Sequence, residues 1–310
     1  MRAAAVAQQR TDRCLVCGGD SFAPMFGDGA GALAERKESA APGAYRITHS
    51  PRELVRAIVR CRECGLGMLP SYLRDSAAVA YAQGEDPSYV RTAPERIANA
   101  HRLLRLVPSG GCLLDVGCAC GFLLVAARER GFDVRGVEPS AWATAYARRE
   151  FGLDVWHGSL EEAPLEPSSF DVVVLADAIE HLGDPRAALQ KLYRLLKPGG
   201  RLLLLTPDLG SLMARVAGAH WWGLLDDHYH YFDRRTLRRL LEDEGFTVER
   251  VAALGREFPL QHWVYKLSQY SPRLHRAVEV LLRTLRLDRR RITINLGDQM
   301  ACVAQKAVQP

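Results

Sequence analysis

From residue 94 onward, short apolar runs alternate with segments whose apolar residues recur at helical spacing. Apolar runs of about 4–8 residues bounded by turn residues are typical of buried parallel strands, and the amphipathic segments are typical of helices that cover a sheet. The alternation predicts an α/β fold with a doubly wound parallel sheet. The expected strands are 112–116, 133–137, 154–157, 170–175, 201–206, 246–254 and 299–306, and the expected helices are 94–106, 122–130, 141–151, 185–196 and 235–244.

The turn after the first expected strand is rich in small residues. Asp115 stands near the end of the strand, and Gly117 and Gly121 lie in the turn that leads into the next helix. Glycine permits a positive φ and a close approach of a ligand to the backbone. Glu138 follows the second strand, where a carboxylate at the carboxyl edge of the sheet can accept hydrogen bonds from both hydroxyls of a ribose. The pattern predicts a nucleoside-containing cofactor.

The spacing of this turn argues against a dinucleotide. The fingerprint of NAD-binding folds is G-x-G-x-x-G, which seats a pyrophosphate on a helix N-terminus. Here the run is Asp115-x-Gly117-x-Ala119-x-Gly121. An acid two residues before the first glycine would repel a pyrophosphate, so it suits a ligand with a cationic amino group.

Three further motifs follow in order: Phe170 to Val174, Ala178-Ile179-Glu180-His181-Leu182, and Leu196 to Leu203 with its Lys-Pro-Gly-Gly turn. Together with the glycine turn they resemble the class I S-adenosylmethionine-dependent methyltransferases over residues 93–306. The resemblance implies a seven-stranded Rossmann-like sheet that closes with an antiparallel hairpin. It also implies S-adenosylmethionine as the cofactor. The residues expected to bind it are Asp115, Gly117, Cys118, Gly121, Glu138, Pro139, Ser159, Leu160 and Asp177.

One position departs from that family. An aspartate that reads the adenine amino group often follows the third strand, whereas Ser159 and Leu160 stand here. The backbone of Leu160 is the expected substitute. Upstream, Tyr81 and Tyr89 precede the helix 94–106, which resembles the family's lid helix. These tyrosines either face the methionine moiety and substrate or pack the junction.

A proton must be removed when a hydroxyl or a C–H group accepts a methyl group. His181 is the first candidate base because histidine titrates near neutral pH, and Glu180 either orients it or is the base itself. Asp177, Glu180 and His181 are also similar to the acid-x-x-Glu-His metal site of ubiquinone-pathway O-methyltransferases, which implies a second, divalent cation. The Glu-His pair also resembles that of deoxysugar C-methyltransferases, which carry an N-terminal zinc module. Alternatively, the pair only begins a helix beside the cofactor.

Two insertions, 208–233 and 256–296, are expected to lie over the active site. The first holds Trp221, Trp222 and the run from Asp226 to Phe232, in which His228 and His230 are further catalytic candidates. This cluster either recognises a sugar or polyol ring or is an aromatic corner that caps the sheet. The second insertion carries an arginine run that is either a solvated face or a site for a diphosphate. Its members are Arg283, Arg286, Arg289, Arg290 and Arg291.

Two CxxC pairs, each followed by glycine, stand near the N-terminus. Cys14 with Cys17 and Cys61 with Cys64 have the spacing of a zinc ribbon, in which four thiolates fill a closed structural site. A reducing compartment disfavours disulfides as the alternative. We therefore expect a zinc-ribbon module and linker over residues 1–74 and the larger domain over residues 75–310. The other four of the chain's eight cysteines are expected to be small hydrophobes.

The net charge and the lengths of the apolar runs limit the classes of partner that we expect for this chain. The net charge of +5 over 310 residues does not indicate a nucleic-acid partner. No run approaches the ~20 apolar residues of a membrane span, and residues 1–10 lack a signal peptide's core, so we expect cytoplasmic residence without membrane insertion. The expected function is methyl transfer to oxygen or carbon of a small molecule such as a sugar, a glycan precursor or a secondary metabolite. The alternatives are a zinc-bearing RNA base methyltransferase and a non-catalytic binding protein.

Overall fold

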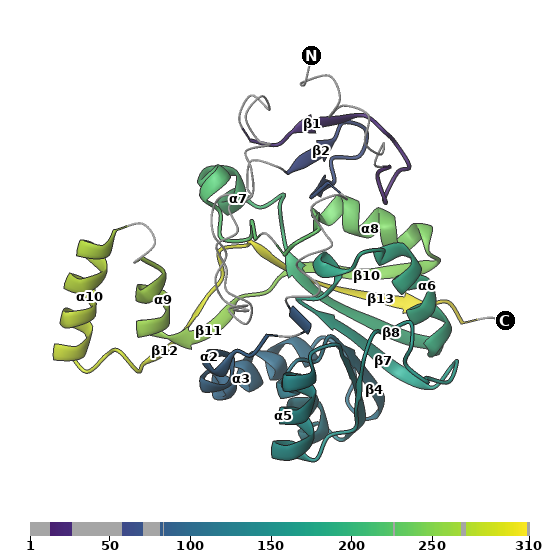
Figure 1. Cartoon of the computed structure of the whole chain (residues 1–310), viewed down its shortest axis with the longest axis horizontal. Helices are drawn as coiled ribbons and strands as arrows, with labels where there is room; N and C mark the ends of the chain where they lie inside the picture. Colours follow the sequence, from purple (N-terminus) through teal and green to yellow (C-terminus); the bar gives the residue numbers. More distant parts are fainter. Residues whose placement is uncertain are drawn as a thin grey trace.

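The computed structural model describes residues 13–26, 58–70, 81–82, 84–225, 227–267 and 271–308. Its main layer is a seven-stranded sheet in the order β10-β13-β8-β7-β4-β5-β6 (Figure 1). Only β13 runs antiparallel to its neighbours, which are β8 and β10. This confirms the expected α/β fold and its antiparallel closing strand. The strands are β4 (Gly111–Val116), β5 (Phe132–Glu138), β6 (Val155–His157), β7 (Phe170–Ala176), β8 (Leu196–Pro207), β10 (Phe246–Ala253) and β13 (Gln299–Lys306).

Helices cover both faces of the sheet because successive strand side chains point to opposite sides. Leu113, Val172 and Leu203 pack into one core with α3 (Ala93–Leu104) and α4 (Phe122–Glu129), and α5 (Ala141–Phe151) adds Ala147 to that core. Leu114 and Val173 point into the other core, with α6 (Pro185–Leu195) and α8 (Arg234–Asp243). The short helix α2 (Pro87–Arg91) precedes α3.

The expected turn at residues 197–200 belongs instead to strand β8. Phe170 of β7 pairs with Leu196, and the next paired residue, Val172, lies opposite Arg201. The Lys197 to Gly200 segment is therefore an irregularity within the strand, with Gly199 at φ 77°. Because β7 already holds both ends of the segment, the Pro-Gly-Gly sequence bends the chain without ending the strand.

A smaller sheet lies at the N-terminal side of the molecule (Figure 1). It is built from β1 (Phe22–Pro24), β2 (Val59–Cys61), β3 (Gly67–Met68) and β9 (His230–Tyr231), in that order. The last of these strands comes from the insertion after β8, which also contains α7 (Leu212–Ala217). Of the expected N-terminal module, residues 1–12, 27–57 and 71–74 lie outside the described residues.

The insertion before β13 forms an arm, by which we mean residues 256–296. It consists of β11 (Arg256–Pro259), α9 (Leu260–Leu267), α10 (Pro272–Thr284) and β12 (Arg291–Ile294), and β11 pairs with β12. Figure 1 shows α9 and α10 extending away from the main sheet instead of folding back over it, because the β11–β12 ribbon carries them outward. Among the described residues, no helix has both the length and the apolar character needed to cross a membrane.

Candidate functional site

The turn after β4 adopts the conformation that its glycines predict. Gly117 has φ 76° and Gly121 has φ 80°, while Ala119 between them is also left-handed at φ 46°. The amides of Gly117 and Cys118 both donate to the carbonyl oxygen of Val137, at 2.8 and 3.2 Å. These bonds tie the turn to the end of β5 and direct the chain into α4, which begins after Gly121.

Glu138 is the last residue of β5 and is fully buried. Its carboxylate accepts hydrogen bonds from the amides of Ala119 at 2.8 Å and Ser140 at 2.7 Å, and from the Tyr81 hydroxyl at 3.3 Å. Burial raises its pKa to about 7, although these three hydrogen bonds favour the ionised carboxylate and act in the opposite direction. The Tyr81 hydroxyl donates to this carboxylate in the same way as a ribose hydroxyl would. A pocket beside this carboxylate is lined by Tyr81, Gly84, Glu85, Asp86, Ser140, Trp142 and Ala143.

Asp115 lies one residue before the end of β4 and is 3% exposed. It makes no side-chain hydrogen bond with the described residues, and burial, followed by the nearby Glu138, raises its pKa to about 8. A buried acid of this kind is ready to bind a cation. Of the other expected cofactor residues, Cys118 and Leu160 are buried and Pro139 is exposed. Ser159 bonds to Glu162, and Tyr89 stacks on Phe122 within the packed lid helices.

A second cluster joins the end of β7 to the insertion after β8. Ligand atoms of Glu180, His181 and His228 all lie within 4.8 Å of one another. The Glu180 carboxylate accepts from the Thr206 hydroxyl at 3.0 Å through Oε2, while its buried Oε1 has no hydrogen-bond partner among the described residues. The two imidazole rings meet edge to face with centroids 4.7 Å apart.

The hydrogen bonds of the two histidines fix which nitrogen is free. His181 Nδ1 lies 2.8 Å from the Asp227 carbonyl oxygen, and His228 Nδ1 lies 3.0 Å from the Gly223 carbonyl oxygen. Carbonyls only accept, so both Nδ1 atoms carry protons, and in the neutral form of each ring the lone pair is on Nε2. The cluster therefore holds two imidazole rings of defined tautomer and one carboxylate oxygen without a hydrogen-bond partner among the described residues.

Burial and neighbouring charges give Glu180, His181 and His228 different pKa values. Burial, with His181 as the second cause, lowers the pKa of His228 to about 4, so this ring is neutral near pH 7. Burial also acts on His181, yet the Asp227 and Glu180 carboxylates hold its pKa above the ordinary histidine value. Burial raises the pKa of Glu180 to about 7. Closely placed groups with separated pKa values are typical of acid–base sites.

Asp177 and His230 are not part of this cluster. The Asp177 carboxylate accepts two hydrogen bonds from Arg256, at 2.6 and 2.8 Å, and one from Gln299 at 2.6 Å. His230 Nε2 lies 3.0 Å from the Leu182 carbonyl oxygen, and the residue forms part of β9. Both residues follow the expected strands, but tertiary partners from the arm, β13 and the small sheet hold their side chains elsewhere.

The aromatic cluster mainly serves as packing. Trp221 and Tyr231 are buried in one apolar group with Ile58 of the N-terminal part, while Trp222 is half-buried at its edge. Trp222 donates from Nε1 to Asp298. The arrangement therefore matches the expected aromatic corner more closely than an open sugar platform. The expected arginines of the arm are exposed.

The four N-terminal cysteines gather at one point. Cys14 Sγ lies 3.3 Å from Cys64 Sγ, and Cys17 Sγ lies 3.5 Å from Cys61 Sγ. These separations exceed a disulfide bond and approach the sulfur separation of about 3.8 Å in a tetrahedral Zn²⁺ site. The hydrogen bond with Cys64 lowers the pKa of the Cys14 thiol to about 5, so a thiolate is already favoured. The four donors fit a structural zinc ion.

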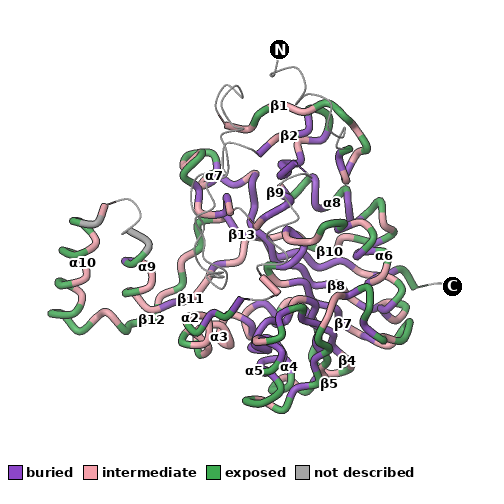
Figure 2. Tube along the Cα trace, in the orientation of Figure 1, coloured by how far each residue is buried: buried purple, intermediate pink, exposed green. Residues whose placement is uncertain are grey.

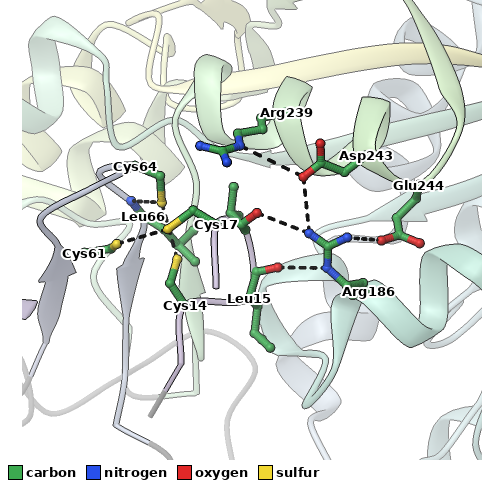
Figure 3. A network of polar contacts seen from close by, with 11 residues as sticks. Cys14, Leu15, Cys17, Cys61, Cys64, Leu66, Arg186, Arg239, Asp243 and Glu244 are labelled. Carbon is green, nitrogen blue, oxygen red and sulfur yellow. Dashed lines mark hydrogen bonds and ion pairs between the residues drawn. The ribbon is translucent and has the colours of Figure 1, made fainter. Parts of the chain in front are cut away.

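The cysteine knuckles are attached firmly to the larger domain (Figure 3). Arg186 of α6 donates to the carbonyl oxygens of Leu15 at 3.0 Å and Val16 at 3.2 Å, and it pairs with Glu244 and Asp243 at the end of α8. The knuckles also share an apolar core with that domain; its members include Cys14, Val16, Cys61, Cys64, Leu66, Phe232, Leu237 and Leu240.

Sequence reasoning missed four partners of the site. Thr206, Asp227 and Arg256 contact Glu180, His181 and Asp177 respectively, and Arg186 holds the knuckles. Only Asp227 carried a signal, because it stands beside His228 in the run of acids, histidines and aromatics. Thr206, Arg186 and Arg256 are ordinary strand-end and helix residues whose role depends on long-range contacts.

Comparison with known proteins agrees with this geometry. Residues 89–251 match a family model described as a methyltransferase domain. A mitochondrial ubiquinone biosynthesis O-methyltransferase from Schizosaccharomyces pombe is 37% identical over 170 residues, which cover 50% of this chain and 62% of that protein. The corresponding enzyme from Idiomarina loihiensis is 33% identical over 167 residues, covering 50% of this chain and 69% of that protein. The chain thus spans less than two thirds of the first relative's length.

A solved structure shares the fold. A SAM-dependent methyltransferase from Thermotoga maritima superposes with a TM-score of 0.50 at 20% identity, covering 71% of this chain and 94% of that chain. At this identity the likeness concerns the fold alone. The family match extends over more than half of the chain and includes the glycine turn, Glu138 and the Glu180-His181 pair. The chain therefore belongs to the class I S-adenosylmethionine-dependent methyltransferase family.

Proposed function

We propose that this chain transfers a methyl group from S-adenosylmethionine to an oxygen atom of a small-molecule acceptor. The observation that carries the proposal is the cluster of Glu180, His181 and His228 at the carboxyl end of β7, on the same sheet edge as Glu138. Ligands of open α/β sheets bind at this edge. The ubiquinone biosynthesis relatives are O-methyltransferases by name, which supports oxygen as the acceptor atom.

Two carboxylates would hold the cofactor. Glu138 would accept hydrogen bonds from the ribose hydroxyls in place of the Tyr81 hydroxyl, and Asp115 would face the amino group. When bound, S-adenosylmethionine supplies an electrophilic methyl group on a sulfonium. The amides that bond Glu138 keep its carboxylate at a fixed position, so the binding geometry is formed before the ligand arrives.

His181 is the proposed general base. Its Nδ1 proton is held by the Asp227 carbonyl oxygen, so Nε2 accepts the proton of the acceptor hydroxyl as that oxygen bonds to the methyl group. The Asp227 and Glu180 carboxylates stabilise the imidazolium that forms, which agrees with the raised pKa of His181. His228, whose pKa is lowered to about 4, stays neutral and contributes no opposing charge.

The same three side chains also fit a divalent cation. One ligand atom from each of Glu180, His181 and His228 lies within 4.8 Å of the other two, and two imidazoles with one carboxylate are a donor set that suits such an ion. The expected set included Asp177, but Arg256 and Gln299 hold that carboxylate, and His228 takes its place. A cation bound here would supply Lewis acidity that lowers the pKa of the acceptor hydroxyl. Recovery of activity with Fe²⁺, added after chelation to protein whose cysteine site has been refilled with zinc, would support this second mode.

The acceptor is proposed to carry several hydroxyl groups, as in a sugar, a glycan precursor or a hydroxylated secondary metabolite. Hydrogen-bonding groups of Asp177, Arg256 and Gln299 gather at the carboxyl end of β7, and Trp222 lies close to Arg256. Such groups suit a polar acceptor, whereas the buried Trp221 and Tyr231 provide no open ring face. The test is a panel of hydroxylated acceptors with formation of S-adenosylhomocysteine as the readout. Turnover with RNA alone would reject the proposal.

Replacing His181 by alanine is expected to lower turnover ~10²-fold or more while cofactor affinity stays within a few-fold, because the base acts on the acceptor and not on the cofactor. Turnover is measured on the acceptor found above, and affinity by calorimetry with S-adenosylhomocysteine. His101→Ala is the matched control, since His101 pairs with Glu129 on the surface of α4. Equal turnover of the His181 and His101 variants would remove His181 from the mechanism.

Cofactor binding is expected to strengthen as pH rises from about 6 to 7.5. The free protein holds protons on Asp115 and Glu138, whose pKa values are raised to about 8 and about 7, whereas the bound form needs both carboxylates ionised. Binding near pH 7 should therefore release protons. Calorimetry in buffers of different ionisation enthalpy measures this release, and Asp115→Asn should reduce it. Proton uptake, or no exchange at all, would contradict the assignment.

A further inference from the structure

The outer surface of the arm has an apolar stripe that nothing in the described part of the chain covers. Leu274, Leu281 and Leu285 are 51%, 55% and 55% exposed. Spacings of seven and eleven residues correspond to about two and three turns of helix, so the three side chains lie on one side of α10 and of the residue after it. Figure 2 shows this outer part of the molecule as largely exposed.

The stripe borders the side of α10 that packs against α9, and its three leucines are more exposed than the residues beside them. His275, Val278 and Leu282 are only partly exposed. The His275 ring meets the Tyr265 ring of α9 with centroids 6.1 Å apart. About half of each leucine is therefore left exposed at the edge of the packing between α9 and α10. Apolar side chains grouped on a projecting element mark an interaction surface.

The positive charge of the chain is concentrated in the same arm. Residues 256–296 contain nine basic and three acidic residues, a net charge of +6, whereas the whole chain has a net charge of +5. Five arginines of the arm are exposed and form no ion pair within the described residues. They are Arg273, Arg276, Arg286, Arg289 and Arg290. The rest of the molecule is thus close to neutral, and the arm attracts negative charge.

We propose that α10 and the turn after it bind the surface of an anionic phospholipid membrane. Such a membrane has an apolar layer that can bury the leucines and phosphate groups that attract the arginines. A second copy of the arm would bring like charges together, and a nucleic acid would leave the leucine stripe uncovered. The helix would lie in the plane of the interface, with the leucines below the headgroups and the arginines extended toward the phosphates.

Vesicle sedimentation tests the proposal with the whole 310-residue chain. Vesicles of phosphatidylcholine are compared with vesicles that contain roughly 30% phosphatidylglycerol, at low and at high salt. We expect at least tenfold stronger binding to the anionic vesicles, reduced by salt. Equal binding to both vesicles, or binding to neither, would overturn the proposal.

Two combined variants separate the contribution of the leucines to vesicle binding from that of the arginines. The combined Leu274→Gln, Leu281→Gln and Leu285→Gln protein keeps the charge and should bind anionic vesicles at least tenfold more weakly. The combined Arg286→Gln, Arg289→Gln and Arg290→Gln protein should lose the preference for anionic lipid. Val308→Gln, at an exposed apolar residue outside the arm, is the control and should bind as wild type. Unchanged affinity for S-adenosylhomocysteine shows that each variant is folded.

Three outcomes would assign the arm differently. Vesicle binding that survives the leucine substitutions would reject the membrane contact. A dimer in light scattering that these substitutions convert to a monomer, without vesicle binding, would identify a second copy as the occupant. Binding to poly(U) that depends on the arginines and not on the leucines would assign the arm to nucleic acid.

Discussion

Replacing Cys61 by serine is expected to release the proposed zinc ion and to lower the thermal midpoint of unfolding by about 10 °C or more. Cys61 is 1% exposed and lies in the same apolar core as Leu237 and Leu240 of α8. Loss of the metal would leave three thiols and a serine hydroxyl crowded in that core without a ligand to bridge them, and the loss would destabilise both sheets. Metal content by atomic emission and the midpoint by circular dichroism measure the two effects.

Two further variants make this result specific. Cys112→Ser is the thiol control, because Cys112 is only partly buried and lies at the start of β4 outside the quartet. It should keep its metal and nearly all of its stability. Arg186→Ala removes the bonds to Leu15 and Val16 without touching a ligand, so it should keep the metal but lower the midpoint. A Cys61→Ser protein with a full equivalent of zinc would refute the site.

The zinc site is also expected to influence the proposed catalytic cluster. β9 pairs with β3 through His230 and Tyr231, while the Tyr229 amide donates to the Glu180 carbonyl oxygen at 2.8 Å. The segment that carries His228 is therefore held between the small sheet and Glu180. Removal of zinc by a chelator should shift the imidazole NMR signals of His181 and His228, whereas that of His101 on α3 should stay in place.

Replacing Glu138 by alanine is expected to weaken S-adenosylmethionine binding about 100-fold or more. Hydrogen bonds to a charged group contribute roughly 1.5–3 kcal/mol each, and the ligand would lose the acceptor for its ribose hydroxyls. The amides of Ala119 and Ser140 would also lose their acceptor, which loosens the turn that approaches the ligand. Calorimetric titration with S-adenosylhomocysteine measures the affinity.

Glu138→Gln and Glu129→Gln complete this series. The glutamine at 138 keeps the shape but turns an amide group toward one of two backbone N–H donors, so its affinity should fall between wild type and alanine. Glu129 is an exposed acid on α4, and its variant should bind as wild type. A loss of less than about threefold for Glu138→Ala would show that the ribose is held elsewhere.

Local pattern was enough to predict the sheet and the cofactor turn. Each expected strand is present, and β13 has the expected bounds of Gln299–Lys306. The strands are apolar because helices cover both faces, and that burial makes their positions visible in the sequence. The left-handed conformations of Gly117 and Gly121 were likewise predictable, since glycine tolerates them at no steric cost.

Side-chain partners across the chain were not predictable in this way. His228 and His230 are two residues apart and equally suited to catalysis by composition, yet only His228 reaches Glu180 and His181. The difference arises because β9 pairs with β3 of the N-terminal part and directs His230 toward the Leu182 carbonyl oxygen. Asp177 was similarly removed from the expected metal set by Arg256, which stands 79 residues away.

The sequence by itself thus determined the fold class, the methyl donor expected from the turn between Asp115 and Gly121, and the cysteine quartet. Each of these depends on residues close together in the chain or on a spacing imposed by one element. The tertiary structure alone decided which polar groups converge at the end of β7, how Arg186 attaches the knuckles to α6 and α8, and that the arm extends outward. These features depend on contacts between distant segments, which no local pattern of residues encodes.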